Sequence, residues 1–254
     1  MRRVIFNQKG GVGKSSIAVN LAAIAASRGR RVLVVDLDAQ CNATQYLLGE
    51  IAELEPNIGQ FFAQTLSFKL REKPLSDYIH GTRFSGLDLI PSNPELMEIE
   101  QLLESKHKIY KFSAALQALQ QNYDEVYIDT PPAFNFYTLS ALIAAQTCLI
   151  PFDCDAFSRR ALYSLLDNIA ETQRDHNPDL RVEGIVVNQF QPRASLPQRL
   201  VDALREEGQP VLKSTLSSSV IMRESHEKSL PLVHLSPKHK LCEEYAALYD
   251  EITV

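Results

Sequence analysis

The sequence predicts an α/β fold in which helices cover both faces of a doubly wound, mostly parallel sheet. Short continuous apolar runs recur along the chain, as is typical of strands that are buried on both faces. Segments with helical periodicity lie between these runs, and the alternation implies right-handed strand–helix–strand connections. The 254 residues suffice for one large core, and no linker, repeat or low-complexity tract divides them. We therefore expect a single domain over residues 1–254.

The expected elements follow one another in regular order. Strands are expected at 4–6, 31–36, 87–90, 125–129, 148–152 and 182–187. Helices are expected at 17–27, 94–104, 109–121, 134–145, 158–175 and 194–207. Gly29 suits the end of the first helix, and Ser236 and Pro237 suit the start of a last helix that runs to Thr253. Residues 49–85, which proline and glycine interrupt, are expected to form short helices and loops at one sheet edge.

The composition limits the kind of protein this is. The net charge is -5, so the chain is not an obvious nucleic-acid binder, although a local basic patch is compatible with that total. The four cysteines include no CxxC pair, suit no zinc site and fit a reducing cytoplasm as free thiols. The first apolar run ends at Asn7, and no stretch approaches the ~20 apolar residues of a spanning helix. We expect a soluble, cytoplasmic protein without a membrane anchor.

A glycine-rich segment between the first strand and the first helix predicts a phosphate site. Glycine lets backbone N–H groups turn toward phosphates, and the helix N-terminus adds its positive dipole end. Lys14 would reach the phosphates, and the Ser15 hydroxyl would bind Mg²⁺. The strict pattern G-x-x-x-x-G-K-[ST] requires glycine where Gln8 stands, and a second lysine, Lys9, precedes the glycines instead. The expected binding residues are Lys9, Gly10, Gly11, Val12, Gly13, Lys14, Ser15 and Ser16.

Three aspartates at strand ends are the expected partners of this loop. Asp129 ends a buried strand and is a candidate Walker B carboxylate that would hold Mg²⁺ with Ser15. Asp36 and Asp38 occupy alternate positions at the end of the second strand, so their side chains point the same way. We expect Asp36 to act at the metal and Asp38 to position the attacking water. Polar strand ends that only cap helices are the alternative.

Three segments together resemble one family. They are the loop from Lys9 to Ser16, Asp36-Leu37-Asp38-Ala39-Gln40-Cys41-Asn42-Ala43-Thr44, and Asp129-Thr130-Pro131-Pro132. They resemble the ParA/MinD family of deviant Walker A P-loop ATPases, and the resemblance extends over nearly the whole chain. Ala39 and Cys41 stand where the family usually has proline and glycine, which alters loop stiffness but removes no catalytic group.

The resemblance implies a cofactor and a mechanism. The cofactors would be ATP or ADP with Mg²⁺. Two subunits would face each other with ATP between them, and Lys9 would reach the partner's phosphates. Lys9, Lys14, Asp36 and Asp38 would then be the catalytic residues of a slow ATPase. ATP would favour the homodimer, and hydrolysis of ATP would let the two subunits dissociate.

The branch of the family follows from what the chain lacks. Residues 241–251 are acidic, whereas membrane-binding MinD-type members end in a basic amphipathic helix. No cysteine follows Asp129 as in the nitrogenase iron-protein branch, and the first strand begins too early for a helix-turn-helix region. The chain is most similar to small, Soj-like partition ATPases. These bind DNA without sequence preference in the ATP state, which would place the protein on the nucleoid, and a ParB-like partner stimulates them.

Two further sites rest on the resemblance. Lys238 and Lys240 match basic positions of the family, and Arg223 is the next candidate for DNA contact. Residues 191–240 hold eight basic and five acidic residues, a local balance of +3, so a solvated mixed-charge face is the alternative. Asn188 ends a strand where the family contacts adenine, and the loop 217–222 would close over the base, although Ser217-Ser218 replaces the family's Pro-Arg.

Other functions are compatible with the same motifs. The ATPase cycle would also suit positioning of chemoreceptor arrays, flagella or carboxysomes. A metabolic P-loop ligase or amidase would need a substrate domain or a cysteine nucleophile, and the sequence indicates neither. A regulatory protein that uses ATP only to present a surface is the third alternative.

Overall fold

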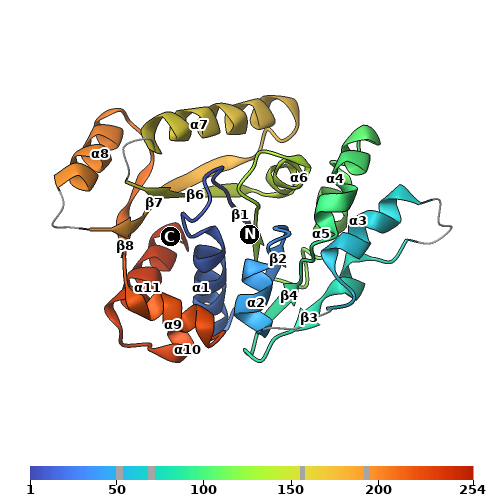
Figure 1. Cartoon of the computed structure of the whole chain (residues 1–254), viewed down its shortest axis with the longest axis horizontal. Coiled ribbons are helices and arrows are strands. Elements are labelled where there is room, and N and C mark those ends of the chain that lie inside the picture. The colour runs from blue at the N-terminus through green and yellow to red at the C-terminus, as the bar shows by residue number, and fades with distance from the viewer. Residues whose placement is uncertain (50–53, 68–71, 155–157, 192–194, 254) are drawn as a thin grey trace.

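The computed structural model describes residues 1–49, 54–67, 72–154, 158–191 and 195–253. Within these ranges the strands form an eight-stranded sheet in the order β3-β4-β2-β5-β1-β6-β7-β8 (Figure 1). All neighbouring strands are parallel except β3, which runs antiparallel to β4 at the edge. The strands are β1 (Arg2–Ile5), β2 (Val32–Asp36), β3 (His80–Gly81), β4 (Leu87–Ile90), β5 (Glu125–Asp129), β6 (Thr147–Asp153), β7 (Arg181–Phe190) and β8 (Val211–Ser217).

Helices cover both faces of the sheet, which confirms the predicted doubly wound architecture (Figure 1). One face carries α1 (Lys14–Ser27), α2 (Asn42–Leu48), α9 (Val220–Glu227), α10 (Leu232–Leu235) and α11 (Lys240–Thr253). The other carries α3 (Ile58–Leu66), the 3₁₀ turn η1 (Leu75–Tyr78), α4 (Leu96–Ser105), α5 (Lys111–Gln117), α6 (Phe136–Ala144), α7 (Ser158–Asp175) and α8 (Ser195–Glu206). No helix in the described part of the chain has both the length and the apolar character needed to cross a bilayer.

The continuous apolar runs have a simple physical cause. In β2, Leu33 and Val35 pack into the core under α3–α7, while Val32 and Val34 pack into the core under α1 and α11. Because successive side chains of a strand point to opposite faces, a strand that is covered on both faces must be apolar at every position.

The expected strands and helices all occur in the structure, in the predicted order. The structure adds β3, α2, α9 and α10, which were not predicted as separate elements, and it differs further at three places. Helix α1 begins at Lys14 and not at 17, so the lysine lies in its first turn. Strand β8 was not predicted, because VLKSTLS lies at the sheet edge and lacks a continuous apolar run. The last helix begins at Lys240, and Ser236 is the C-cap residue of α10, whose N–H donates to the carbonyl of Leu232 at 2.8 Å. The predicted N-cap at Ser236 was therefore wrong.

The strand order places three strand ends at one point. From β1 the chain crosses to β2, and β5 later enters the sheet between these two strands. After β5 the chain continues to β6, which pairs with the other side of β1, so the strand order reverses at β1. In register, Asp129 is opposite Asp36 on β2 and opposite Ile5 on β1. Crevices at the carboxyl ends of strands where the strand order reverses are the usual ligand sites of such sheets. The glycine-rich loop that follows β1 lies at this point.

Candidate functional site

The glycine-rich loop has a backbone that only glycine fits at two positions. Gly11 and Gly13 have φ angles of +76° and +88°, in the left-handed region. A Cβ atom on Gly13 would lie 2.3 Å from Nδ2 of Asn188, so the space beside the loop is filled as well. Gly13 is also the N-cap of α1, so the turn delivers the chain directly into the helix that carries Lys14 and Ser15.

Amide side chains from two strand ends hold the loop in this shape. Asn188 donates from Nδ2 to the carbonyl of Val12 at 2.8 Å, and Gln189 donates from Nε2 to the carbonyl of Gly11 at 3.0 Å. Asn7 accepts from the N–H of Lys9 at 2.9 Å. The structure thus places Asn188 beside the loop, with one amide hydrogen bonded to it. Sequence analysis did not identify Asn7 or Gln189, although an amide at a strand end is a recognisable signal.

Lys14 lies buried among carboxylates. Its side chain donates to the carbonyl of Lys9 at 3.1 Å. Burial lowers the pKa of Lys14, and Asp129 and Asp38 act in the opposite direction. A buried ammonium group at the N-terminus of a helix, where anions are favoured, is suited to bind phosphate oxygens.

Asp129 is the least satisfied polar group of the site. Its side chain is fully buried, and neither carboxylate oxygen has a hydrogen-bond partner of ordinary geometry among the described residues. Burial and the neighbouring Asp36 raise the pKa of Asp129 well above its ordinary value, while Ser15 and Lys14 partly offset this. A buried carboxylate without partners is costly unless a cation compensates it.

Asp36 and Asp38 shape the loop that leads to α2. Asp36 accepts hydrogen bonds from the N–H of Asp38 at 3.0 Å and from the N–H and Oγ1 of Thr44 at 2.8 and 2.7 Å. Burial raises the pKa of Asp36 to about 6, and the bonds from Thr44 lower it. Asp38 accepts from the N–H of Gln40 at 3.0 Å and lines the cavity described below. Asp36 is therefore engaged with the backbone, whereas Asp38 faces the cavity.

The oxygen atoms of Ser15 and Asp129 are suited to bind a small divalent cation that is also bound by the phosphates of a ligand. The Ser15 hydroxyl and the unpartnered Asp129 carboxylate are hard oxygen donors, which Mg²⁺ prefers. Within the described residues no group of three or more His, Cys, Asp or Glu side chains could hold a metal ion alone. Mg²⁺ usually binds through one or two carboxylates together with substrate phosphates, so the residues present fit this ion.

Lys9 lies at the outer side of the loop. Its side chain is 37 % exposed, and its Nζ lies 2.5 Å from Oδ2 of Asp153, the last residue of β6. Lys9 and Lys14 thus have different surroundings, because Lys14 is buried in the site while Lys9 is at its edge.

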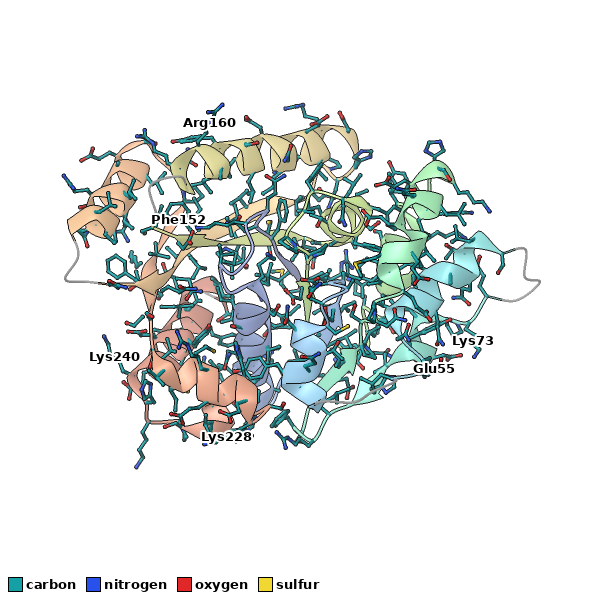
Figure 2. All side chains as sticks on the ribbon, in the orientation of Figure 1. Glu55, Lys73, Phe152, Arg160, Lys228 and Lys240 are labelled. Atoms are coloured by element: carbon teal, nitrogen blue, oxygen red, sulfur yellow. The ribbon has the colours of Figure 1, made fainter. Side chains whose placement is uncertain are left out.

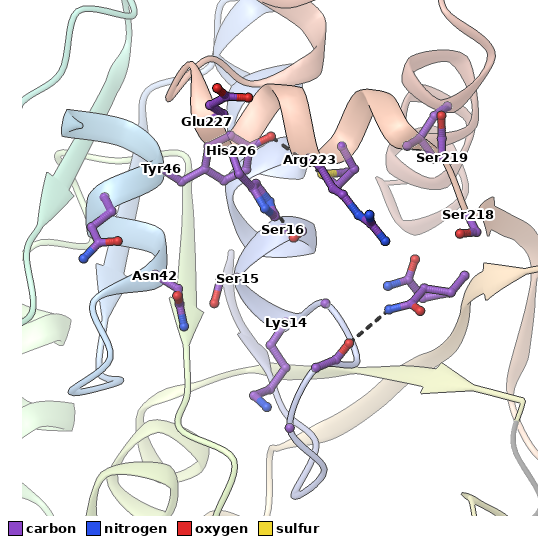
Figure 3. A pocket seen from close by; sticks show the side chains of 18 of the residues that line it. Lys14, Ser15, Ser16, Asn42, Tyr46, Ser218, Ser219, Arg223, His226 and Glu227 are labelled. Atoms are coloured by element: carbon purple, nitrogen blue, oxygen red, sulfur yellow. Dashed lines mark hydrogen bonds between the residues drawn. The ribbon is translucent and has the colours of Figure 1, made fainter. Parts of the chain in front are cut away.

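A cavity of about 930 Å³ lies between the loop and the segment that joins β8 to α9 (Figure 3). The volume suits a nucleotide-sized ligand. The predicted loop 217–222 is instead the end of β8, a two-residue turn and the first turn of α9. Residues of both sides line the cavity, among them Gly10, Gly11, Gly13, Lys14, Ser15, Ser16, Asp38, Asn188, Ser217, Ser218, Ser219, Arg223 and His226.

The residues predicted to contact DNA are separated in the structure. Arg223 lines the cavity, whereas Lys238 is exposed in the turn before α11 and Lys240 is exposed at its first residue. Lys240 pairs with Glu244 at 3.3 Å and lies at the outer margin of the molecule in Figure 2. Arg193, which contributed to the predicted basic balance, lies outside the described residues.

The unpartnered carboxylate yields a stability prediction. Asp129→Asn is expected to raise the melting temperature of the ligand-free protein at pH 8 by roughly 5 °C, because it removes a buried carboxyl group whose ionisation the fold disfavours, at a cost of about 1–3 kcal/mol. The folded-state pKa of Asp129 is raised, so folding loses stability as pH rises through that pKa. The gain should therefore be smaller at pH 5. Differential scanning calorimetry without magnesium checks this, with the exposed Asp167→Asn as a control. Equal or lower stability of Asp129→Asn at pH 8 would contradict the interpretation.

Comparisons with known proteins identify the family to which the chain belongs. A family model described as an AAA domain matches residues 3–182. The chromosome partitioning protein ParA of Myxococcus xanthus is 34% identical over 250 residues, which are 98% of this chain and 86% of that protein. The sporulation initiation inhibitor protein Soj of Bacillus subtilis is 31% identical over 250 residues, or 98% and 96%. The structure of cobyrinic acid a,c-diamide synthase from Mycobacterium smegmatis with bound ATP analog and magnesium matches with a TM-score of 0.84 at 26% identity, covering 98% of this chain and 92% of that one. The resemblance read from the sequence is confirmed, and the chain belongs to the ParA/MinD-type family of partition ATPases.

Proposed function

We propose that this protein is an ATP-driven assembly switch of the ParA type. It binds ATP and Mg²⁺ in the cavity beside the glycine-rich loop and hydrolyses ATP slowly to ADP and phosphate. The observation that carries this proposal is the buried, unpartnered carboxylate of Asp129 next to Lys14 and Ser15. Such a group is compensated when a cation enters the site. The related diamide synthase, solved with an ATP analog and magnesium, supports the identity of the ligand.

Each residue of the site then has a defined role. Lys14 binds the β- and γ-phosphates, and the loop N–H groups surround them. Ser15 and Asp129 would hold Mg²⁺, which would supply positive charge against the phosphates. Asp36 keeps the β2–α2 loop in place through Thr44 and the backbone of Asp38. Asp38, which faces the cavity, orients the water that attacks the γ-phosphate.

Lys9 extends the site to a second copy of the chain. In the homodimer, with ATP between the two subunits, Lys9 reaches the phosphates bound to its partner. A second cation there stabilises the charge that develops during phosphoryl transfer, as an arginine finger does. In the single chain Lys9 is paired with Asp153 at the edge of the loop. When Lys9 leaves Asp153 and binds the phosphates of the partner subunit, ATP binding is coupled to formation of the dimer.

The ATP-bound dimer acts on a cargo, and DNA is the cargo that the relatives favour. The Myxococcus protein is a chromosome partitioning protein, and it aligns with nearly the whole chain. Lys238 is exposed in the turn before α11 and Lys240 at the first residue of α11, and dimerisation would double the number of these charges. A ParB-like partner would stimulate hydrolysis and release the dimer from the nucleoid. Chemoreceptor, flagellar or carboxysome-like cargo would use the same cycle with a different partner.

A metabolic function has one observation in its favour, which is the similarity to the diamide synthase. Such an enzyme needs residues that bind a second substrate. No cysteine lines the cavity among the residues that the structure describes, and burial raises the pKa of the Cys41 thiol to about 11, so it is a poor nucleophile. The partition function is therefore favoured.

Two variants test binding and hydrolysis separately. Lys14→Ala is expected to lose ATP binding, because it removes the buried cation of the phosphate loop. Asp38→Ala is expected to bind ATP as the unmodified protein does but to hydrolyse it about 100-fold more slowly, since only water positioning is lost. Calorimetric titration and phosphate release measure the two effects. Tight binding by Lys14→Ala would refute the loop assignment, and unchanged turnover of Asp38→Ala would place the catalytic role elsewhere.

A charge reversal tests the cargo. Lys238→Glu combined with Lys240→Glu is expected to abolish ATP-dependent retention of duplex DNA at low salt, because phosphate contacts become repulsive. The exposed Lys73→Glu, at the opposite end of the molecule in Figure 2, is the matched control. Absence of ATP-dependent DNA binding by the unmodified protein would exclude DNA as the cargo.

A further inference from the structure

The cavity has a second wall that no phosphate-loop motif predicts. It consists of the end of β8, the turn at 218–219 and the side of α9 that faces α1. Figure 3 shows Arg223 and His226 pointing from α9 toward the loop and the first turn of α1. The two residues are three positions apart on a helix, and side chains at this spacing share one face.

This wall is held in place by a buried polar network. Asn20 of α1 donates to the carbonyl of Ser16 at 2.8 Å and to the hydroxyl of Tyr46 at 3.0 Å, and it accepts from the N–H of Leu232 at 2.9 Å. The Tyr46 hydroxyl is also hydrogen bonded to Ser225 of α9. Asn20 and Ser225 are 1 % and 0 % exposed. Because these buried groups satisfy one another, α9 has a fixed position relative to α1 before any ligand binds.

His226 links this wall to the phosphate site itself. A hydrogen bond of 2.9 Å joins its Nε2 to Oγ of Ser16, and its ring packs edge-on against Tyr46 with centroids 4.5 Å apart. Ser16 follows Lys14 and Ser15, which serve the β- and γ-phosphates and the metal. A side chain that meets Ser16 from the opposite wall therefore faces the part of a nucleotide beyond those groups, which is the α-phosphate and the ribose.

We propose that Arg223 and His226 form a second nucleotide contact, to the α-phosphate and ribose, on the wall opposite the phosphate loop. This inference rests on the proposed nucleotide site. A guanidinium group can donate two parallel hydrogen bonds to a phosphate, and an imidazole can bind a ribose hydroxyl or a phosphate oxygen. Arg223 is then a ligand-binding residue, and DNA contact is left to Lys238 and Lys240. Since ADP and ATP share the α-phosphate and ribose, this contact sets the affinity for both and does not distinguish them.

The inference predicts which ligands each variant affects. Arg223→Gln is expected to weaken magnesium-ADP and a magnesium complex of a non-hydrolysable ATP analogue by about tenfold each, the loss of one charged hydrogen bond. His226→Ala should weaken both by a few fold. Inorganic pyrophosphate, which occupies only the loop side, should bind all variants equally. Titration calorimetry with unlabelled ligands measures these affinities and leaves the ribose unmodified.

A cation at the end of the same helix provides the matched control. Lys228 is the C-cap of α9, is exposed, pairs with Glu224 at 3.8 Å and does not line the cavity. Lys228→Gln should bind ADP as the unmodified protein does. Arg223 is exposed, so its replacement leaves the core intact, and melting temperatures verify this for each variant.

Five outcomes distinguish the alternatives. Selective loss of ADP and ATP-analogue affinity, with pyrophosphate unchanged, supports the inference. Unchanged ADP affinity in both variants overturns the inference. Loss of DNA retention alone by Arg223→Gln, with its nucleotide affinity intact, also overturns it. Equal loss of pyrophosphate and ADP also overturns it, because the variant would then act through the phosphate loop. Failure of the unmodified protein to bind either ADP or pyrophosphate would refute the proposed nucleotide site itself.

Discussion

The structure depends on one constraint, which is that a lysine and carboxylates are buried together at the point where the strand order reverses. Lys14, Asp129 and Asp36 are drawn from three elements that the sheet brings into register. Two of these groups are satisfied from within the chain, Lys14 by a loop carbonyl and Asp36 by Thr44 and the backbone. Neither carboxylate oxygen of Asp129 has a hydrogen bond of ordinary geometry in the described residues, and Ser15 and Lys14 offset the cost of its burial only in part. The site is therefore incomplete in electrostatic terms, and a cation together with an anion of matching shape would complete it.

Hydrogen bonds fix the two walls of the cavity beside these buried charged groups. The left-handed backbone at Gly11 and Gly13 allows the loop to approach the β7 end, and Asn188 and Gln189 bind it there. On the far side, the network around Asn20 fixes α9 against α1. A nucleotide would therefore enter a preformed slot between two walls, which reduces the ordering cost of binding. Lys9 lies at the edge of the loop, outside these two supports, and is paired with Asp153.

Sequence analysis predicted the sheet and the loop side of the site because both are local. Apolar runs identify buried strands, and the spacing of Gly10, Gly13, Lys14 and Ser15 identifies a phosphate loop without knowledge of distant segments. The α9 wall was not predicted in this way, because His226 is 210 positions from Ser16 and only the tertiary fold brings the two together. For the same reason the sequence indicated Arg223 only as a candidate for DNA contact, and the structure adds that this residue lines the cavity. The edge strand β8 was missed because half-exposed edge strands carry no continuous apolar run.

We propose that ATP converts the site of one chain into half of a two-chain site through Lys9. Sedimentation velocity with ATP and Mg²⁺ measures this conversion. The samples are the unmodified protein, Lys9→Ala and the exposed control Lys106→Ala. We predict that the unmodified protein and Lys106→Ala sediment as dimers with ATP and as monomers without nucleotide. Lys9→Ala should remain monomeric although it still binds ATP. An ATP-dependent dimer of Lys9→Ala with unchanged stability would contradict the claim.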